Sequence, residues 1–298
     1  MPPSSGTQCS AYAGQKLSRG EGCGPSEGPR LGALAPAPPL PHYCRVNQAL
    51  RDLEELVVDA WPASETHELD GWLLRSSGGP SRRGNSVATL AFGRERDVAT
   101  AIGEVEAWYA ARGAPARFQL GPCARPKQLA EVLLARGYQA EGAAIFALAP
   151  AFPLSARRPT DAFSVRITPQ PDAGWHELLQ AGRFAGEPDP LRGVLRDLGT
   201  RCRFATAYEG QERAVAAALG IASEDRLGVY NMLTAPAARR RGAAQSLLHA
   251  LAQSAIADGM RELYLLVEQD NQPARTLYAS AGFRDVYPYG YLTQPKQT

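Results

Sequence analysis

The residues with the clearest chemical potential form a basic turn near the C-terminus that can hold an anion. The turn consists of Arg239, Arg240, Arg241, Gly242, Ala243 and Ala244. Its guanidinium groups are charge-assisted hydrogen-bond donors, and the small residues that follow let an anion approach the backbone. If a helix begins at Gly242, its first N–H groups have no intrahelical partner and its positive dipole end faces the same anion. The turn is therefore predicted to bind phosphate, although three arginines alone would also suit a solvated turn.

The elements around the turn favour the phosphate site. Residues 227–233 (Leu-Gly-Val-Tyr-Asn-Met-Leu) are rich in strand formers, and Pro236 bounds them. After Gly242 the apolar residues recur with the spacing of one helix face, and Gly259 is a typical helix stop. These apolar residues are Ala244, Leu247, Leu248, Leu251 and Ala255. A strand, the basic turn and a helix are thus predicted in that order.

A second segment completes a family pattern. It runs through a predicted strand at 263–267, then Asn271, Ala274, Leu277-Tyr278 and Gly282-Phe283. Arg239, Gly242 and Ala244 match a pyrophosphate loop of the form Gln or Arg, two residues, Gly, one residue, Gly or Ala. Together the two segments resemble the acetyl-CoA site of the GNAT superfamily of N-acetyltransferases. The resemblance is close over the last third of the chain and looser over the last half.

The resemblance implies that acetyl-CoA is the cosubstrate, and no metal is expected. The residues that it implies for acetyl-CoA binding are Met232, Leu233, Thr234, Arg239, Arg240, Arg241, Gly242, Ala243, Ala244, Asn271, Ala274 and Tyr278. It also implies that an amine attacks the thioester directly and that a backbone N–H near Leu233 polarises the carbonyl. Tyr278 would then protonate the departing thiolate, a step that suits a phenol near its ordinary pKa.

The general base has a weaker signal. Some members of the family carry a glutamate inside the second strand, and the matching position here is Leu266. Glu268 lies two residues further on, so strand alternation places it on the same face as Leu266. Glu268 is therefore a candidate for the group that takes the amine proton, and a surface glutamate at a strand end is the alternative. An amine of low pKa would need no base.

The first half of the chain repeats the order of the second half at an offset of 145 residues (282 − 137). The match rests on Gly137-Tyr138, which parallels Gly282-Phe283. The same offset places Asp97 opposite Gly242, and Leu133 opposite Tyr278. A carboxylate at the position of the phosphate loop would repel pyrophosphate. The first half is therefore predicted to be a GNAT-like copy that has lost its cofactor site.

The predicted fold class is α/β (α+β), with two tandem GNAT-like domains that each contain a mixed, mostly antiparallel sheet flanked by helices. Residues 1–44 are dense in Gly, Pro and Ser and are predicted to be a disordered leader. The first copy is predicted over 45–150, a linker over 151–160, and the catalytic copy over 161–298. Arg82, Arg83 and Asn85 in the first copy are predicted to contact the acceptor or the other copy, or to form a solvated hairpin.

Composition bounds the partners of the chain. A net charge of +2 and a pI near 8.3 over 298 residues give no case for a nucleic-acid protein. No segment approaches the ~20 apolar residues of a membrane span. The five cysteines form no Cys-x-x-Cys pair, and the four histidines show no ligand spacing. Reduced thiols, a cytoplasmic location and the absence of zinc are therefore expected.

The expected acceptor is a primary amine of a small molecule or peptide, and the expected assembly is a monomer or a homodimer. The alternative function is a non-catalytic acyl-CoA-binding sensor or interaction module built from two acetyltransferase-like halves. Asn271 and Tyr278 argue against that alternative, because a module that only binds has no use for an acid. A nucleic-acid contact through the three arginines is a third interpretation, which the near-neutral charge balance disfavours.

Overall fold

The computed structural model describes residues 43–79, 81–93, 95–157, 159–182, 191–210 and 212–295, without the side chains of residues 43–47 and of Arg192. The described residues belong to one compact unit. The predicted leader over 1–44 lies outside the described residues, apart from Tyr43 and Cys44, with which helix α1 begins.

The first copy contains three helices and five strands among its described residues. In chain order these are α1 (Tyr43–Asp59), β1 (Glu65–Leu69), β2 (Trp72–Ser76), β3 (Val87–Ala88), α2 (Val98–Ala110), β4 (Arg117–Leu120), α3 (Leu129–Ala135) and β5 (Gln139–Pro150). The predicted linker over 151–160 begins with a short helix, α4 (Ala151–Ser155).

The second copy follows the same plan with a longer N-terminal part. It contains β6 (Ser164–Thr168), α5 (Ala173–Ala181), α6 (Arg192–Leu198), β7 (Cys202–Glu209), β8 (Arg213–Ser223), β9 (Arg226–Thr234), α7 (Ala243–Ala257), β10 (Glu262–Glu268), α8 (Gln272–Ala281) and β11 (Arg284–Thr293). Short 3₁₀ turns occupy Gly199–Arg201 and Pro236–Ala238.

The predicted repeat of the two copies is present in the structure. Helices α2 and α7, strands β4 and β10, and strands β5 and β11 begin at positions that differ by 145 in every case (243 − 98, 262 − 117, 284 − 139). In both copies the strand before the repeated helix pairs in parallel with the strand after it, β3 with β4 and β9 with β10. The tandem fold class expected from the sequence is therefore confirmed.

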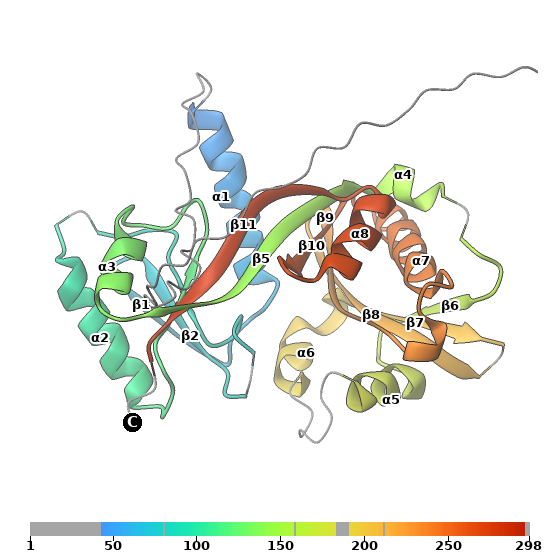
Figure 1. The fold of residues 1–298 in the computed structure, drawn as a ribbon, viewed down its shortest axis with the longest axis horizontal. Coiled ribbons are helices and arrows are strands. Elements are labelled where there is room, and N and C mark those ends of the chain that lie inside the picture. Colours follow the sequence, from blue (N-terminus) through green and yellow to red (C-terminus); the bar gives the residue numbers. More distant parts are fainter. Residues whose placement is uncertain are drawn as a thin grey trace, which may run out of the picture. The chain divides into compact units, whose positions relative to one another are not determined.

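The two copies share a single sheet because they exchange their last strands. The order of the eleven strands is β1-β2-β3-β4-β11-β5-β10-β9-β8-β7-β6. Strand β5 of the first copy pairs antiparallel with β10, from Glu262↔Pro150 to Glu268↔Ala144. Strand β11 of the second copy pairs antiparallel with β4. Strands β5 and β11 also pair with each other and lie side by side in Figure 1, so each copy needs the other to complete its sheet.

The two faces of the shared sheet carry different layers. Along β5, Ile145 and Ala147 point to the face covered by α4 and α7, whereas Ala144 and Phe146 point to the face covered by α1, α5 and α6. We call these the α7 face and the α1 face. The core of the α7 face is mostly aliphatic, whereas the core of the α1 face is rich in tryptophan and tyrosine.

Candidate active site

The centre of the candidate site is a splay between two parallel strands. Strands β9 and β10 pair only from Arg226↔Glu262 to Val229↔Leu265. Beyond that point β9 continues to Thr234 beside β8, and β10 continues to Glu268 beside β5. The facing edges of the two strands then have no strand partner, so their backbone N–H and C=O groups can pair with an extended ligand.

A β-bulge sets the direction of the β9 arm. The register with β8 runs from Leu219↔Tyr230 to Ala217↔Leu233, so β9 holds one extra residue there. Asn231 lies within this bulge with φ +48, in the left-handed region that asparagine tolerates better than most residues. The bulge lets Met232 join the core on the α7 face although Tyr230 lies on the α1 face.

Helix α7 begins without a side-chain cap. Its N-cap is Gly242, which has φ +95. No side chain caps the helix by a hydrogen bond from this position. A Cβ at this glycine would lie 2.7 Å from Cγ2 of Thr160, so the backbone approach also depends on glycine. The equivalent helix of the first copy, α2, is capped by Asp97, whose carboxylate accepts a hydrogen bond of 2.8 Å from the Thr100 N–H. The first N–H groups of α7 therefore remain available to an anion. In the first copy, the carboxylate of Asp97 takes the corresponding place at the start of α2.

The three arginines of the turn divide into two groups. Arg239 and Arg240 line the cavity at the end of α7, and Nε of Arg239 donates to the Thr234 carbonyl at 3.3 Å. Arg241 turns away from the cavity, pairs with Glu209 and lies 5.4 Å from the ring centroid of Phe163. The prediction that Arg241 binds the cofactor is therefore not supported by its position, because its charge is already engaged elsewhere.

The splay, the basic turn and α8 enclose a cavity of about 870 Å³, a size typical of ligand sites. It is lined by Met232, Leu233, Thr234, Pro236, Ala238, Arg239, Arg240, Gly242, Ala243, Ala244, Gln245, Asn271, Pro273, Ala274, Leu277 and Tyr278. Every residue expected to bind acetyl-CoA, apart from Arg241, is in this lining. Pro236, Ala238, Gln245, Pro273 and Leu277 were missed, and all of them lie between or next to motif residues.

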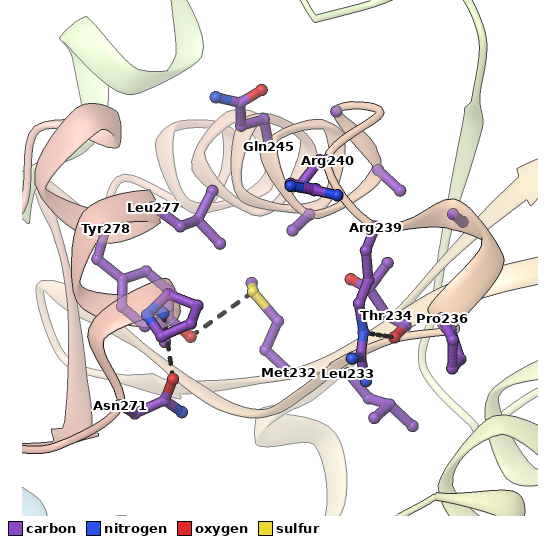
Figure 2. A pocket seen from close by; sticks show the side chains of 16 residues that line it. Met232, Leu233, Thr234, Pro236, Arg239, Arg240, Gln245, Asn271, Leu277 and Tyr278 are labelled. Carbon is purple, nitrogen blue, oxygen red and sulfur yellow. Dashed lines mark hydrogen bonds between the residues drawn. The ribbon is translucent and has the colours of Figure 1, made fainter.

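Tyr278 and Met232 face each other across the cavity (Figure 2). The phenol hydroxyl donates to Sδ of Met232 at 3.7 Å. Burial raises the pKa of Tyr278 to about 12, which differs from the ordinary phenol pKa expected from the sequence. The hydroxyl therefore stays protonated at neutral pH, so that Tyr278 can act as a general acid but not as a general base. Asn271 has a structural task as well, since its side-chain oxygen accepts a hydrogen bond of 3.2 Å from the Ala274 N–H and caps α8.

Glu268 lies outside this cavity. Along β10, Leu265 and Val267 belong to the α7 face and Leu266 to the α1 face, so Glu268 shares the face of Leu266, as strand alternation predicts. Its side chain is 59% exposed, and an oxygen of its carboxylate lies 3.7 Å from the Arg82 guanidinium. The candidate acid and the candidate base thus occupy opposite faces of the splayed sheet.

Removing the charge of Arg240 should weaken binding of acetyl-CoA. We expect Arg240→Gln to raise the Kd by about 10-fold at low salt, because a charge-assisted hydrogen bond is worth about 1.5–3 kcal/mol in favourable cases and this residue is exposed. Arg241→Gln is the matched control and should change the Kd by less than about 3-fold, because Arg241 pairs with Glu209. Calorimetric titration measures both, and equal losses in the two variants would contradict the division of the arginines.

Parallel strands that splay beside an uncapped, glycine-led helix N-terminus and a tyrosine define an acetyltransferase of the GNAT superfamily. Residues 48–292 match a family model described as "Probable histone acetyltransferase Rv0428c C-terminal", and the chain belongs to that family. "Uncharacterized N-acetyltransferase YobR" of Bacillus subtilis is 27% identical over 247 residues, which are 81% of this chain and 97% of that protein. "Probable histone acetyltransferase Rv0428c" of Mycobacterium tuberculosis is 41% identical over 64 residues, which are 22% of this chain and 20% of that protein.

Solved structures share the fold at low identity. A GCN5-related N-acetyltransferase from Kribbella flavida matches with a TM-score of 0.62 and 14% identity, over 84% of this chain and 95% of that one. A tandem GNAT protein from the clavulanic acid biosynthesis pathway matches with a TM-score of 0.56 and 11% identity, over 86% of this chain and 97% of that one.

Among the described residues, no helix combines the length and the apolar character that crossing a membrane requires. The same part of the chain brings together no group of three or more His, Cys, Asp or Glu side chains that could hold a metal ion.

Proposed function

We propose that this acetyltransferase moves the acetyl group of acetyl-CoA to a primary amine, and that a single cavity in the second copy binds the donor. The observation that carries the proposal is the convergence of three features on that cavity. They are the unpaired edge of β9 beyond Val229, the uncapped N-terminus of α7 beside Arg239 and Arg240, and the hydroxyl of Tyr278. Each feature suits a different part of acetyl-CoA.

The three features would divide the donor between them. The first N–H groups of α7 and the two arginines suit the pyrophosphate, because both act on negative charge. The free edge of β9 around Met232 to Thr234 suits the amide-bearing pantetheine arm, which can pair with it as an added strand would. That placement would bring the thioester to the end of the cavity where Tyr278 faces Met232.

The reaction proposed for this site is a direct transfer. The amine nitrogen attacks the thioester carbonyl, a C–N bond forms, and the C–S bond breaks. Tyr278 gives its proton to the departing sulfur, and the amine loses a proton to Glu268, directly or through water. The products are the N-acetyl amine and coenzyme A. The reaction conserves protons, because the amine loses one and the departing sulfur gains one.

The high pKa of Tyr278 is compatible with this role. In equal surroundings a phenol of pKa about 12 would not protonate a thiolate whose pKa is about 8.5. The sulfur, however, departs in the same buried cavity, where desolvation disfavours the thiolate as it does the phenolate. The two pKa values are therefore expected to move in the same direction, which keeps the proton transfer feasible.

The proposal is tested by incubating the chain with acetyl-CoA and a panel of amines. We expect release of coenzyme A, measured with a thiol reagent, together with a mass increase of one acetyl group on an amine of the panel. The panel contains amino acids, uncharged amines, polyamines and lysine-rich peptides. Binding of acetyl-CoA without acetylation of any amine would favour the alternative, a non-catalytic acyl-CoA sensor.

A further inference from the structure

The loop that joins β2 to β3 in the first copy is built around Asn85. The Asn85 side-chain oxygen accepts a hydrogen bond of 2.9 Å from the Ser77 N–H, and its amide donates to the Ser81 carbonyl at 2.8 Å. The Asn85 carbonyl in turn accepts a hydrogen bond of 3.1 Å from Arg117. These bonds hold the part of the loop that carries Arg82 and Arg83 in a defined position at the end of the antiparallel β2–β3 hairpin.

Arg83 is directed into the aromatic core of the α1 face. Its guanidinium carbon lies 5.5 Å from the ring centroid of Trp61 and 5.4 Å from that of Tyr230, which is cation–π distance. It also interacts with the side chain of Tyr289. These rings come from the segment that follows α1, from β9 and from β11, so both copies contribute to the surroundings of one arginine.

The charge of Arg83 has no carboxylate partner within 4.0 Å among the described residues, although many other arginines of the chain have one. Its Nε is buried without a hydrogen-bond partner, and the same is true of the Trp61 indole N–H and the Tyr291 hydroxyl. Burying donor atoms such as the Arg83 Nε without a hydrogen-bond partner is costly, and the contacts of Arg83 with the rings and with Tyr289 offset only part of that cost. Such a group of donors is complementary to an anion.

The two arginines of the loop reach both arms of the splay. Arg83 lies over Tyr230, the last residue of β9 before the bulge, and Arg82 lies 3.7 Å from Glu268 at the end of β10. The loop therefore spans the gap between the strands on the face opposite the donor cavity. A molecule bound there would approach the thioester through the splay, with the candidate base beside it.

We propose that Arg83 binds a carboxylate of the acceptor, and that the acceptor is consequently an amino acid or another amine that carries a carboxylate. This inference rests on the proposed function and specifies the substrate class of the same site. The planar guanidinium suits bidentate recognition of a carboxylate, and the Trp61 and Tyr291 donors lie in the same aromatic core. It also assigns a task to the first copy, which supplies the specificity-determining residue to the active site of the second.

The charge of the loop argues against a lysine-rich acceptor. A cationic peptide would meet Arg82 and Arg83 with like charge at the splay, whereas a zwitterionic amino acid would present its carboxylate to Arg83 and its amine to Glu268. The histone named for relatives of this chain is therefore not the class of acceptor that these residues favour.

The experiment compares each proteinogenic amino acid with its carboxamide as the acceptor. We expect the wild-type chain to acetylate at least one amino acid with a kcat/KM on the order of 10–10² times that of its amide, a ratio that matches the value of a charge-assisted hydrogen bond. Arg83→Gln should remove this preference by lowering kcat/KM for the acid to the level of its amide, while the Kd of acetyl-CoA stays unchanged. Arg112→Gln, which removes an arginine paired with Glu65 elsewhere in the first copy, should keep the preference.

The outcomes separate the two proposals. Equal rates for acids and amides, or faster acetylation of lysine-rich peptides, would overturn the carboxylate inference and leave the acetyltransferase function standing. No acetylation of any amine would instead overturn the proposed function. The comparison of acid with amide uses the wild-type chain, so it decides the question even if Arg83→Gln does not fold.

Discussion

Replacing Tyr278 with phenylalanine should lower kcat by about 10²-fold while the Kd of acetyl-CoA stays within about 2-fold of the wild-type value. The change removes one hydroxyl, whose partner is the Met232 sulfur at 3.7 Å. Thioether sulfur is a weak acceptor, so the loss leaves no strong polar group unsatisfied and the fold should be retained. The expected effect is therefore confined to protonation of the leaving sulfur.

Tyr138→Phe is the matched control for the tyrosine prediction. It removes a hydroxyl that donates to Glu106 at 3.0 Å in the first copy, away from the donor cavity, and it should leave kcat unchanged. Steady-state kinetics with saturating acceptor provides the comparison. Wild-type turnover in the Tyr278→Phe variant would show that another group, or none, protonates the thiolate.

The pH profile of the wild-type chain gives a second readout of Tyr278. Burial raises the pKa of this phenol to about 12, so the acid form persists as the pH rises and is lost only near pH 12. We therefore expect no descending limb of kcat between pH 7 and about pH 10 from this group. A fall with a midpoint near pH 9 that is absent from Tyr278→Phe would contradict the assignment of the raised pKa.

Gly242→Asp should abolish measurable binding of acetyl-CoA, because it recreates in the second copy the acidic cap that α2 has in the first. A carboxylate about 4 Å from a phosphate costs roughly 1–4 kcal/mol, according to the local dielectric. The substitution also removes the space that the glycine leaves and strains a backbone with φ +95. Both effects should raise the Kd.

Gly242→Asn separates charge from bulk. Asparagine has the shape of aspartate and tolerates the left-handed backbone equally, so both variants meet the same contact with Thr160. We expect the Gly242→Asp variant to bind acetyl-CoA at least 10-fold more weakly than the Gly242→Asn variant at low salt. The difference should be smaller at high salt. Equal Kd values for the two variants would show that no phosphate lies near the N-terminus of α7.

Most of the lining of the cavity between β9, α7 and α8 could be predicted from the sequence, because its residues lie in two short segments with local signals. A run of strand-forming residues, a basic turn and an amphipathic helix form one wall of the cavity. The segment from Asn271 to Tyr278 forms the other wall. The face of the sheet on which Glu268 lies could also be predicted, because side chains alternate between the two faces along a strand. The direction of the Arg241 side chain could not be predicted, because its partner, Glu209, comes from a distant hairpin.

The exchange of β5 and β11 could not be predicted in this way. Pairing between strands distant in the sequence leaves no local pattern, and β5 reads only as an apolar run, of which residues 145–148 resemble a strand. In the structure β5 extends over 12 residues because it pairs on both sides, with β10 and with β11. The aromatic surroundings of Arg83 depend on the same exchange, since Tyr289 and Tyr291 belong to β11. The surroundings of Arg83 therefore combine residues of both copies.

Calorimetric titration of the wild-type chain with acetyl-CoA counts the donor sites. We expect one site per chain, since α7 leaves its first N–H groups free whereas Asp97 caps α2. Two sites per chain would show that the first copy also binds the donor. No binding at all would contradict the assignment of the cavity between β9, α7 and α8 as an acetyl-CoA site.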